Sequence, residues 1–217
     1  MPEQSENQPI STWKLFLFSG FLILVLITAL RTIVANGIQT LSATMLMESY
    51  EQISPSIGNL LNILIIIAGI VGVVIVNVFI YPRLIHNEAI ATLILLCMAI
   101  VPVSIMGAIG KLATPVIIVC LCVASAIMSG IGLLMSRCSA AFAKHGKNGL
   151  ASGVCNAFTS VGFMVQNYAV VVLADKAGWD KVIYLWIVLL AISVLGMAVT
   201  IPLWSKFRRS MTKVCWR

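Results

Sequence analysis

Charged side chains are scarce in this sequence: 10% of the 217 residues are charged and 60% are apolar. A soluble domain typically has about 25% charged and about 45–50% apolar residues. A water-soluble fold of 23.4 kDa could not hide this much apolar surface, because small domains leave a large fraction of their surface exposed. With a mean hydropathy of +1.06, most of the chain is expected to have lipid as its solvent.

The sequence also lacks the motifs of catalysis and of metal or nucleotide binding. Its two histidines, His86 and His145, fall between the apolar stretches, so no stretch offers the serine–histidine pair of an intramembrane hydrolase. There is no Walker motif and no dinucleotide glycine fingerprint. The six cysteines have no metal-ligand spacing. We therefore expect no enzyme activity, no cofactor and no metal.

Two further classes are disfavoured by the distribution of charge. The net charge of +7 comes from short basic clusters between long uncharged runs, which suits an anionic membrane surface and not nucleic acid. The segment 1–13 is polar and slightly acidic and lacks the basic start of a signal peptide, so the first helix is expected to stay in the mature protein.

Long uncharged stretches are what the sequence does contain. About 20 apolar residues are needed to cross a bilayer as a helix, and strands of such length would leave backbone groups unpaired in lipid. The chain is therefore predicted to be an all-α membrane protein with a six-helix bundle over 14–205. The predicted helices cover approximately residues 15–47, 56–80, 89–110, 112–136, 150–174 and 182–204.

The first helix contains the one charged residue inside a predicted span, Arg31. We interpret the segment 15–47 as one long helix, with an irregularity near Gly37 and with Arg31 near mid-membrane. A buried arginine costs about 2.5–3.5 kcal/mol on insertion scales, so such residues usually face a bundle interior or a wet cavity. The alternative is that the helix ends near residue 34 and Arg31 extends to the outer interface.

Lysine and arginine counts predict the orientation. With the N-terminus inside, ten basic residues fall in inner segments and three in outer ones, which is a firm positive-inside bias. The segment 1–13 and the basic tail 206–217 are then both cytoplasmic. We expect a multi-pass protein of the plasma (cytoplasmic) membrane.

Polar side chains recur at helical spacing on three of the helices. The candidate solute-binding residues on these stripes are Arg31 and Gln39 on the first helix, Asn59 and Asn62 on the second, and Asn156, Ser160 and Asn167 on the fifth. Because polar groups facing lipid are costly, each stripe is expected to point inward. Either the stripes line a polar cavity, or they form hydrogen bonds between helices.

Small residues on the same helices predict close helix packing. Gly149 and Gly153 form a small-xxx-small pair, and Gly69 with Gly72 is interpreted in the same way, as packing. Gly130 and Gly132 are interpreted in the same way.

The order of these segments resembles the C-terminal six-helix half of a major facilitator superfamily transporter. Gly153, Asn156 and Gly162 match the small-residue, asparagine and glycine pattern of that family's eleventh helix, and Gly178 with Trp179 matches the short outer loop after it. The early stretch LRTIVANGIQT is similar to the seventh helix of the organophosphate:phosphate antiporter branch, where an arginine contacts phosphate. By this resemblance Arg31 would be that residue.

The resemblance implies a 3+3 inverted repeat and half of a secondary active transporter. Its partners would be a small solute, for which the arginine favours an anion, the lipid bilayer, and a second six-helix half that is either a missing N-terminal half or another copy in a homodimer. Transport would proceed by alternating access, as in an antiporter. The alternative is a non-transporting membrane subunit or an inactive fragment of a broken transporter gene.

Overall fold

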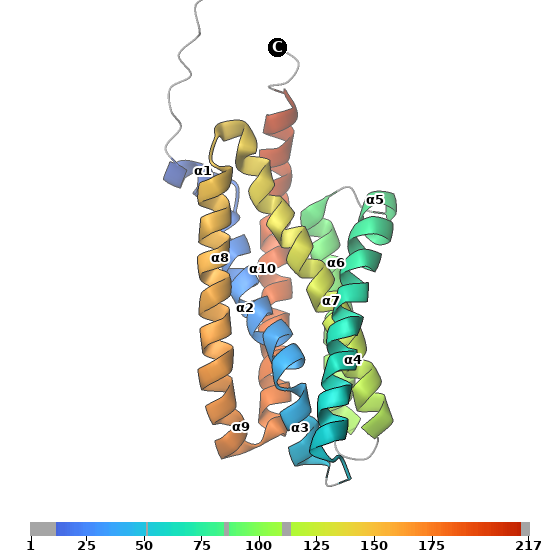
Figure 1. Cartoon of the computed structure of the whole chain (residues 1–217). Helices are drawn as coiled ribbons and strands as arrows, with labels where there is room; N and C mark the ends of the chain where they lie inside the picture. Colours follow the sequence, from blue (N-terminus) through green and yellow to red (C-terminus); the bar gives the residue numbers. More distant parts are fainter. Residues whose placement is uncertain (1–11, 51, 85–86, 110–113, 214–217) are drawn as a thin grey trace, which may run out of the picture.

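The computed structural model describes the chain except for residues 1–11, 51, 85–86, 110–113 and 214–217. The described residues form helices and no strand, in an elongated bundle (Figure 1). Six of the helical stretches are long and apolar enough to cross a membrane, with mean hydropathy between 1.5 and 3.1. This confirms the prediction of an all-α, multi-pass membrane protein with six spans.

Several of the spans are built from more than one helical element. In chain order the elements are α1 (Thr12–Phe18), α2 (Phe21–Thr40), α3 (Ser42–Ser49), α4 (Pro55–Val74), the π-helix η1 (Ile75–Ile80), α5 (Tyr81–Leu84), α6 (Glu88–Ile109), α7 (Thr114–Ala140), the 3₁₀-helix η3 (Ala141–His145), α8 (Asn148–Val165), the π-helix η4 (Gln166–Val170), α9 (Val171–Ala177) and α10 (Trp179–Lys213).

The segment 15–47, predicted as one long helix, is divided into three. Gly20 adopts a left-handed conformation (φ 71°) that a side chain would strain, and it separates α1 from α2. A second break falls at Leu41, between α2 and α3. The irregularity expected near Gly37 falls one turn later, at this break, where the Leu41 N–H donates to the Gly37 carbonyl. The last helix also differs from the prediction: α10 continues past the expected end at 204 as far as Lys213.

The first span lies at the centre of the bundle. Of its most apolar window, 78% is buried, and α2 packs against α7, α8 and α10. Helix α7 packs in turn against α4 and α6. The spans that contain α4 and α8 are only 28% and 22% buried, and they stand on opposite sides of α2 in Figure 1. The most exposed helices therefore flank the most buried one.

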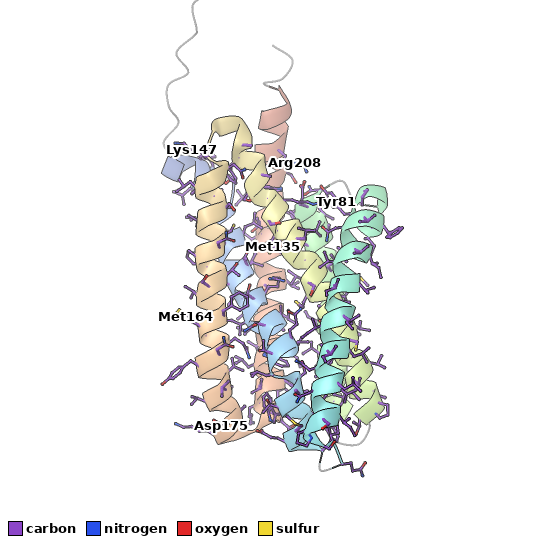
Figure 2. The ribbon with its side chains drawn as sticks, in the orientation of Figure 1. Tyr81, Met135, Lys147, Met164, Asp175 and Arg208 are labelled. Atoms are coloured by element: carbon purple, nitrogen blue, oxygen red, sulfur yellow. The ribbon has the colours of Figure 1, made fainter. Side chains whose placement is uncertain are left out.

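The two ends of the bundle differ in charge. Lys147, Tyr81 and Arg208 lie at one end, which we call the basic end, and Asp175 lies at the other (Figure 2). Helix α1 and the last turns of α10 are also at the basic end (Figure 1).

An aromatic cluster closes the basic end of the bundle. Phe142 of η3 is fully buried, and its ring lies 4.9 Å from that of Phe21 and 5.2 Å from that of Phe207, between ring centroids. Phe16 and Trp204 complete the cluster, at 5.3 and 6.2 Å from Phe142. One side chain in the α7–α8 connection thus joins the start of the first span to the end of the last.

We expect Phe142→Ala to lower the free energy of unfolding by about 3–5 kcal/mol, the usual cost of truncating a buried aromatic residue. Thermal unfolding of the purified chain in detergent measures the effect. Phe158→Ala is the matched control, because Phe158 on α8 is 40% exposed and should lose little. Equal shifts for the two variants would contradict a stabilising role for the cluster.

Candidate functional site

Arg31 is buried between α2 and α7, with 9% of its surface exposed. Its Nη1 donates to the carbonyl of Met128 at 2.6 Å, and its Nη2 donates to Thr32 Oγ1 at 3.3 Å. Its Nε has no hydrogen-bond partner among the described residues. Because α2 continues for nine residues beyond Arg31, the alternative in which the helix ends near residue 34 is wrong.

The space for this guanidinium comes from Gly132 on α7. A Cβ atom at this position would lie 3.0 Å from Arg31 Nη1. Among the described residues no ion pair involves Arg31, and the segment from Phe21 to Met47 contains no acidic residue. A positive charge is therefore held inside the bundle without a carboxylate to neutralise it, which is an arrangement that attracts an anion.

Gln39 joins the first, second and fourth spans. Its Nε2 donates to Ser129 Oγ of α7 at 2.8 Å. On α4, a Cβ at Gly69 would lie 2.9 Å from Ser129 Oγ and 3.2 Å from Gln39 Nε2. Three helices can approach this polar contact because the residue on α4 has no side chain.

Asn36 joins the first span to the fifth. Its Nδ2 donates to Asn167 Oδ1 of η4 at 3.3 Å. Asn36 and Gln39 are three positions apart and so lie on neighbouring parts of the α2 surface. The stripes predicted on the second and fifth helices are thus brought to adjacent points of the first.

We call this region the polar face. Its members are Asn36, Gln39, Asn59, Asn62, Ser129, Asn156, Ser160 and Asn167. Asn59 and Asn62 share the side of α4 that carries Gly69, and Asn156 and Ser160 share the side of α8 that leads to Asn167.

The expectation that each stripe points into the bundle is wrong for part of the polar face. Asn59, Asn156, Ser160 and Asn167 are exposed, whereas Gln39 and Asn62 are half-buried. The physical reason is that α4 and α8 each have one packed side, and those sides are taken by glycines. Gly162 faces the backbone of Ala29, and Asn156, Ser160 and Asn167 are turned away from this contact on α8. Gly72 makes the corresponding close contact between α4 and the backbone of Ala126.

Sequence reasoning missed three residues of the region: Asn36, Ser129 and the buried Gln166. A usable signal was present for two of them. Asn36 precedes Gln39 by three positions, and Ser125, Ser129 and Gly132 recur at helical spacing on α7. Their partners, however, lie 131 and 90 residues away, and helical spacing does not reveal such pairs.

Gln166 is fully buried, and neither polar atom of its amide has a partner among the described residues. Leaving a buried polar group unsatisfied costs about 1–3 kcal/mol. The amide lies against α2, where a Cβ at Gly37 would be 2.8 Å from Gln166 Nε2 and 2.6 Å from Trp186 Cζ2. Trp186 Nε1 is also buried without a partner among the described residues.

Polar and charged side chains near the ends of the spans tie helices together at both ends of the bundle. At the basic end, Tyr81 donates to Glu88 Oε1 at 2.7 Å, and Arg208 forms an ion pair with Glu88 Oε2. The Arg137 guanidinium lies 4.9 Å from the Tyr81 ring centroid. Burial, with the neighbouring Glu88 carboxylate, raises the pKa of Tyr81, so this hydroxyl keeps its proton at neutral pH.

At the opposite end, the Trp179 indole donates to Glu48 Oε2 at 2.8 Å and so links α10 to α3. This hydrogen bond joins the first span to the last through side chains and not only through helix packing. Tyr50 lies at the same end, where burial and, to a smaller extent, the charge of Asp180 raise its pKa.

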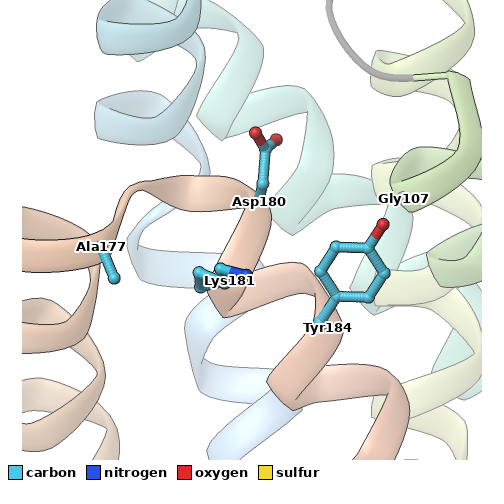
Figure 3. Close-up of a pocket in the computed structure, with 5 residues that line it drawn as sticks. All are labelled: Gly107, Ala177, Asp180, Lys181 and Tyr184. Carbon is cyan, nitrogen blue, oxygen red and sulfur yellow. The ribbon is translucent and has the colours of Figure 1, made fainter.

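A pocket of about 340 Å³ opens at this same end (Figure 3). It is lined by Gly107 of α6 and by Ala177, Asp180, Lys181 and Tyr184 around the α9–α10 turn. None of the seven predicted solute-binding residues lines it. Its two charged groups, Asp180 and Lys181, are exposed residues at the start of α10. Neither Arg31 nor any residue of the polar face lines this pocket.

The groups at this site are suited to recognising an anion. The site combines one buried guanidinium, which can hold a carboxylate or phosphate through paired hydrogen bonds, with amides and hydroxyls that donate and accept. Neither a family model nor a curated protein matches this chain.

Proposed function

We propose that this protein is half of a secondary active transporter of the major facilitator type, which moves a small anionic solute across the plasma membrane by alternating access. In this proposal both ends of the chain are cytoplasmic, so the basic end faces the cytoplasm. The solute binds at Arg31 and the polar face, and a second six-helix half covers that face.

The observation that carries the proposal is the state of Arg31. Arg31 is 9% exposed, its Nε has no hydrogen-bond partner among the described residues, and it lies in a span without acidic residues. A buried charge of this kind is rarely retained in a membrane span unless it serves a pathway or a ligand. An anionic solute would supply the charge that the bundle lacks.

Two further observations support a bundle with an internal 3+3 repeat. Phe21 and Thr114, which begin the first and fourth spans, are 93 positions apart, as are Pro55 and Asn148, which begin the second and fifth. The third and sixth spans begin at Glu88 and Trp179, which are 91 positions apart. Three helices per repeat would invert the second copy, as in many secondary transporters.

Glycines recur with the same spacing. Gly37 and Gly130 are 93 positions apart, and each faces a residue of a π-helix on the neighbouring span. Gly69 and Gly162 have this separation as well: Gly69 packs against Ser125 and Ser129, and Gly162 packs against the Ala29 carbonyl and Thr32. Glycines with this separation thus occupy close helix contacts in both halves of the bundle.

The exposed polar side chains on α4 and α8 support the presence of a second six-helix half. Asn156 and Ser160 on α8 and Asn59 on α4 would face hydrocarbon if the chain stood alone in a bilayer, which is costly. A second six-helix unit placed over α4 and α8 would bury these groups and would enclose the solute between two halves.

A photoreactive amino acid placed at Asn156 tests this arrangement. In native membranes it is expected to cross-link to a second copy of the chain or to one other chain with six spans. The matched control is the same group at Leu195 on α10, which is 68% exposed and apolar and should react with lipid alone. If position 156 also reacted only with lipid, the chain would be a stand-alone subunit and the proposal would fail.

A further inference from the structure

Two short π-helices interrupt the spans that flank the centre of the bundle. η1 (Ile75–Ile80) lies in the second span and η4 (Gln166–Val170) in the fifth. A π turn holds one residue more than an α turn of the same kind, and such turns are frequent at functional sites. η1 begins 20 residues after Pro55 and η4 begins 18 residues after Asn148, so both occupy nearly the same place in their spans.

Each π-helix crosses a glycine of a more central helix. A Cβ at Gly130 of α7 would lie 2.5 Å from Val76 Cγ2 in η1, and a Cβ at Gly37 of α2 would lie 2.8 Å from Gln166 Nε2 in η4. The backbone of each central helix is therefore open to the π turn at the crossing point. An ordinary side chain at Gly130 would press on Val76 of η1, and one at Gly37 would press on Gln166 of η4 and on Trp186.

Each π-helix also holds a buried amide that is incompletely bonded. Asn77 Nδ2 donates to the carbonyl of Val73 at 3.0 Å and to that of Gly130 at 3.3 Å, while its Oδ1 has no partner among the described residues. Gln166 makes no hydrogen bond through either amide atom within the same part of the chain. η1 is thus tied to α7 by one hydrogen bond, from Asn77 to the Gly130 carbonyl, and η4 is tied to α2 by one, from Asn36 to Asn167. Gln166, the first residue of η4, adds none among the described residues.

The change of register that a π turn permits is large. Successive residues of an α-helix are separated by about 100° around the axis. Converting a π turn to α therefore rotates the part of the span before it by about one residue position relative to the part after it. In the fifth span this rotation would take Gln166 off Gly37 and would turn Asn156 and Ser160 with α8.

We propose that η1 and η4 are a matched pair of register switches, at which the second and fifth spans turn their polar stripes relative to α7 and α2. Gly130 and Gly37 leave room for the π state. The Gln166 amide makes no hydrogen bond among the described residues, so η4 is the easier of the two π-helices to convert to α. The use of this rotation in transport rests on the proposed function, but the switch itself does not.

Backbone hydrogen–deuterium exchange of the purified chain in lipid nanodiscs tests the switches without any transport measurement. The amides of η4 are expected to exchange at least 10-fold faster than those of residues 158–165 in the same span, and η1 is expected to fall between them. Exchange in η4 no faster than in residues 158–165 would overturn the proposal and would leave the transporter proposal untouched.

Two alanine variants make the test reciprocal. Gly37→Ala should accelerate exchange in η4 several-fold and leave η1 unchanged, because the new methyl group displaces Gln166. Gly130→Ala should accelerate η1 and leave η4 unchanged. Gly153→Ala is the control, since no atom of the described chain lies within 4 Å of the added Cβ. A uniform increase along all spans in both variants would indicate general destabilisation and would also overturn the proposal.

Discussion

The Arg31→Met variant is expected to fold as stably as the parent protein and, if the proposed transport function holds, to lose about 10–100-fold in anion exchange. The loss corresponds to about 1.5–3 kcal/mol, the usual contribution of hydrogen bonds to a charged group. Stability is expected to hold because an apolar side chain of similar length often replaces a buried charge at no cost or with a gain. The measurement is exchange of radiolabelled inorganic phosphate by liposomes that contain the chain assembled with its second half.

Arg31→Lys separates charge from geometry. Lysine keeps the positive charge but lacks the planar fork, so it should recover only part of the phosphate exchange. Thermal unfolding of all three proteins in detergent provides the stability control. Undiminished exchange by Arg31→Met would remove Arg31 from the solute path, and a large loss of stability would show that the guanidinium is mainly structural.

A large loss of stability is expected for Gly72→Ala, which should lower the free energy of unfolding by about 3 kcal/mol or more. A Cβ at this position would overlap the Cα, carbonyl carbon and carbonyl oxygen of Ala126 in α7. Since these are backbone atoms, no rotamer change can relieve the overlap, and α4 must move away from α7. Overpacking of a core typically costs about 1–3 kcal/mol even where side chains can adjust. Thermal unfolding in detergent measures the loss.

Gly153→Ala on α8 is the matched control, and its effect should have the opposite sign. Nothing in the described part of the chain lies within 4 Å of the added Cβ, so alanine should gain up to about 1 kcal/mol from its better helix propensity. A similar loss of stability in both variants would contradict the close α4–α7 contact. The same comparison tests the small-residue pair Gly149 and Gly153, which sequence reasoning assigned to packing and which the bundle leaves exposed.

The polar face shows where sequence reasoning reached its limit. Gln39 and Asn167 were predicted as site residues, and each makes a hydrogen bond to another span. Asn156 and Ser160 share one face of α8 as their spacing predicts, but that face is exposed. Periodicity identifies residues that lie on one side of a helix, and it does not determine which neighbour that side meets.

The sequence alone determined that six helices are long and apolar enough to cross a membrane and that one arginine lies inside the first of them. Both follow from sums over about 20 neighbouring residues, because transfer into lipid depends on the local content of apolar and charged side chains. The tertiary structure decided the rest: the breaks at Gly20 and Leu41, the glycine crossings, and the pairing of Arg31 with the Met128 carbonyl. These features depend on how each helix is rotated and where it crosses another, and the residues that fix them are far apart in the chain.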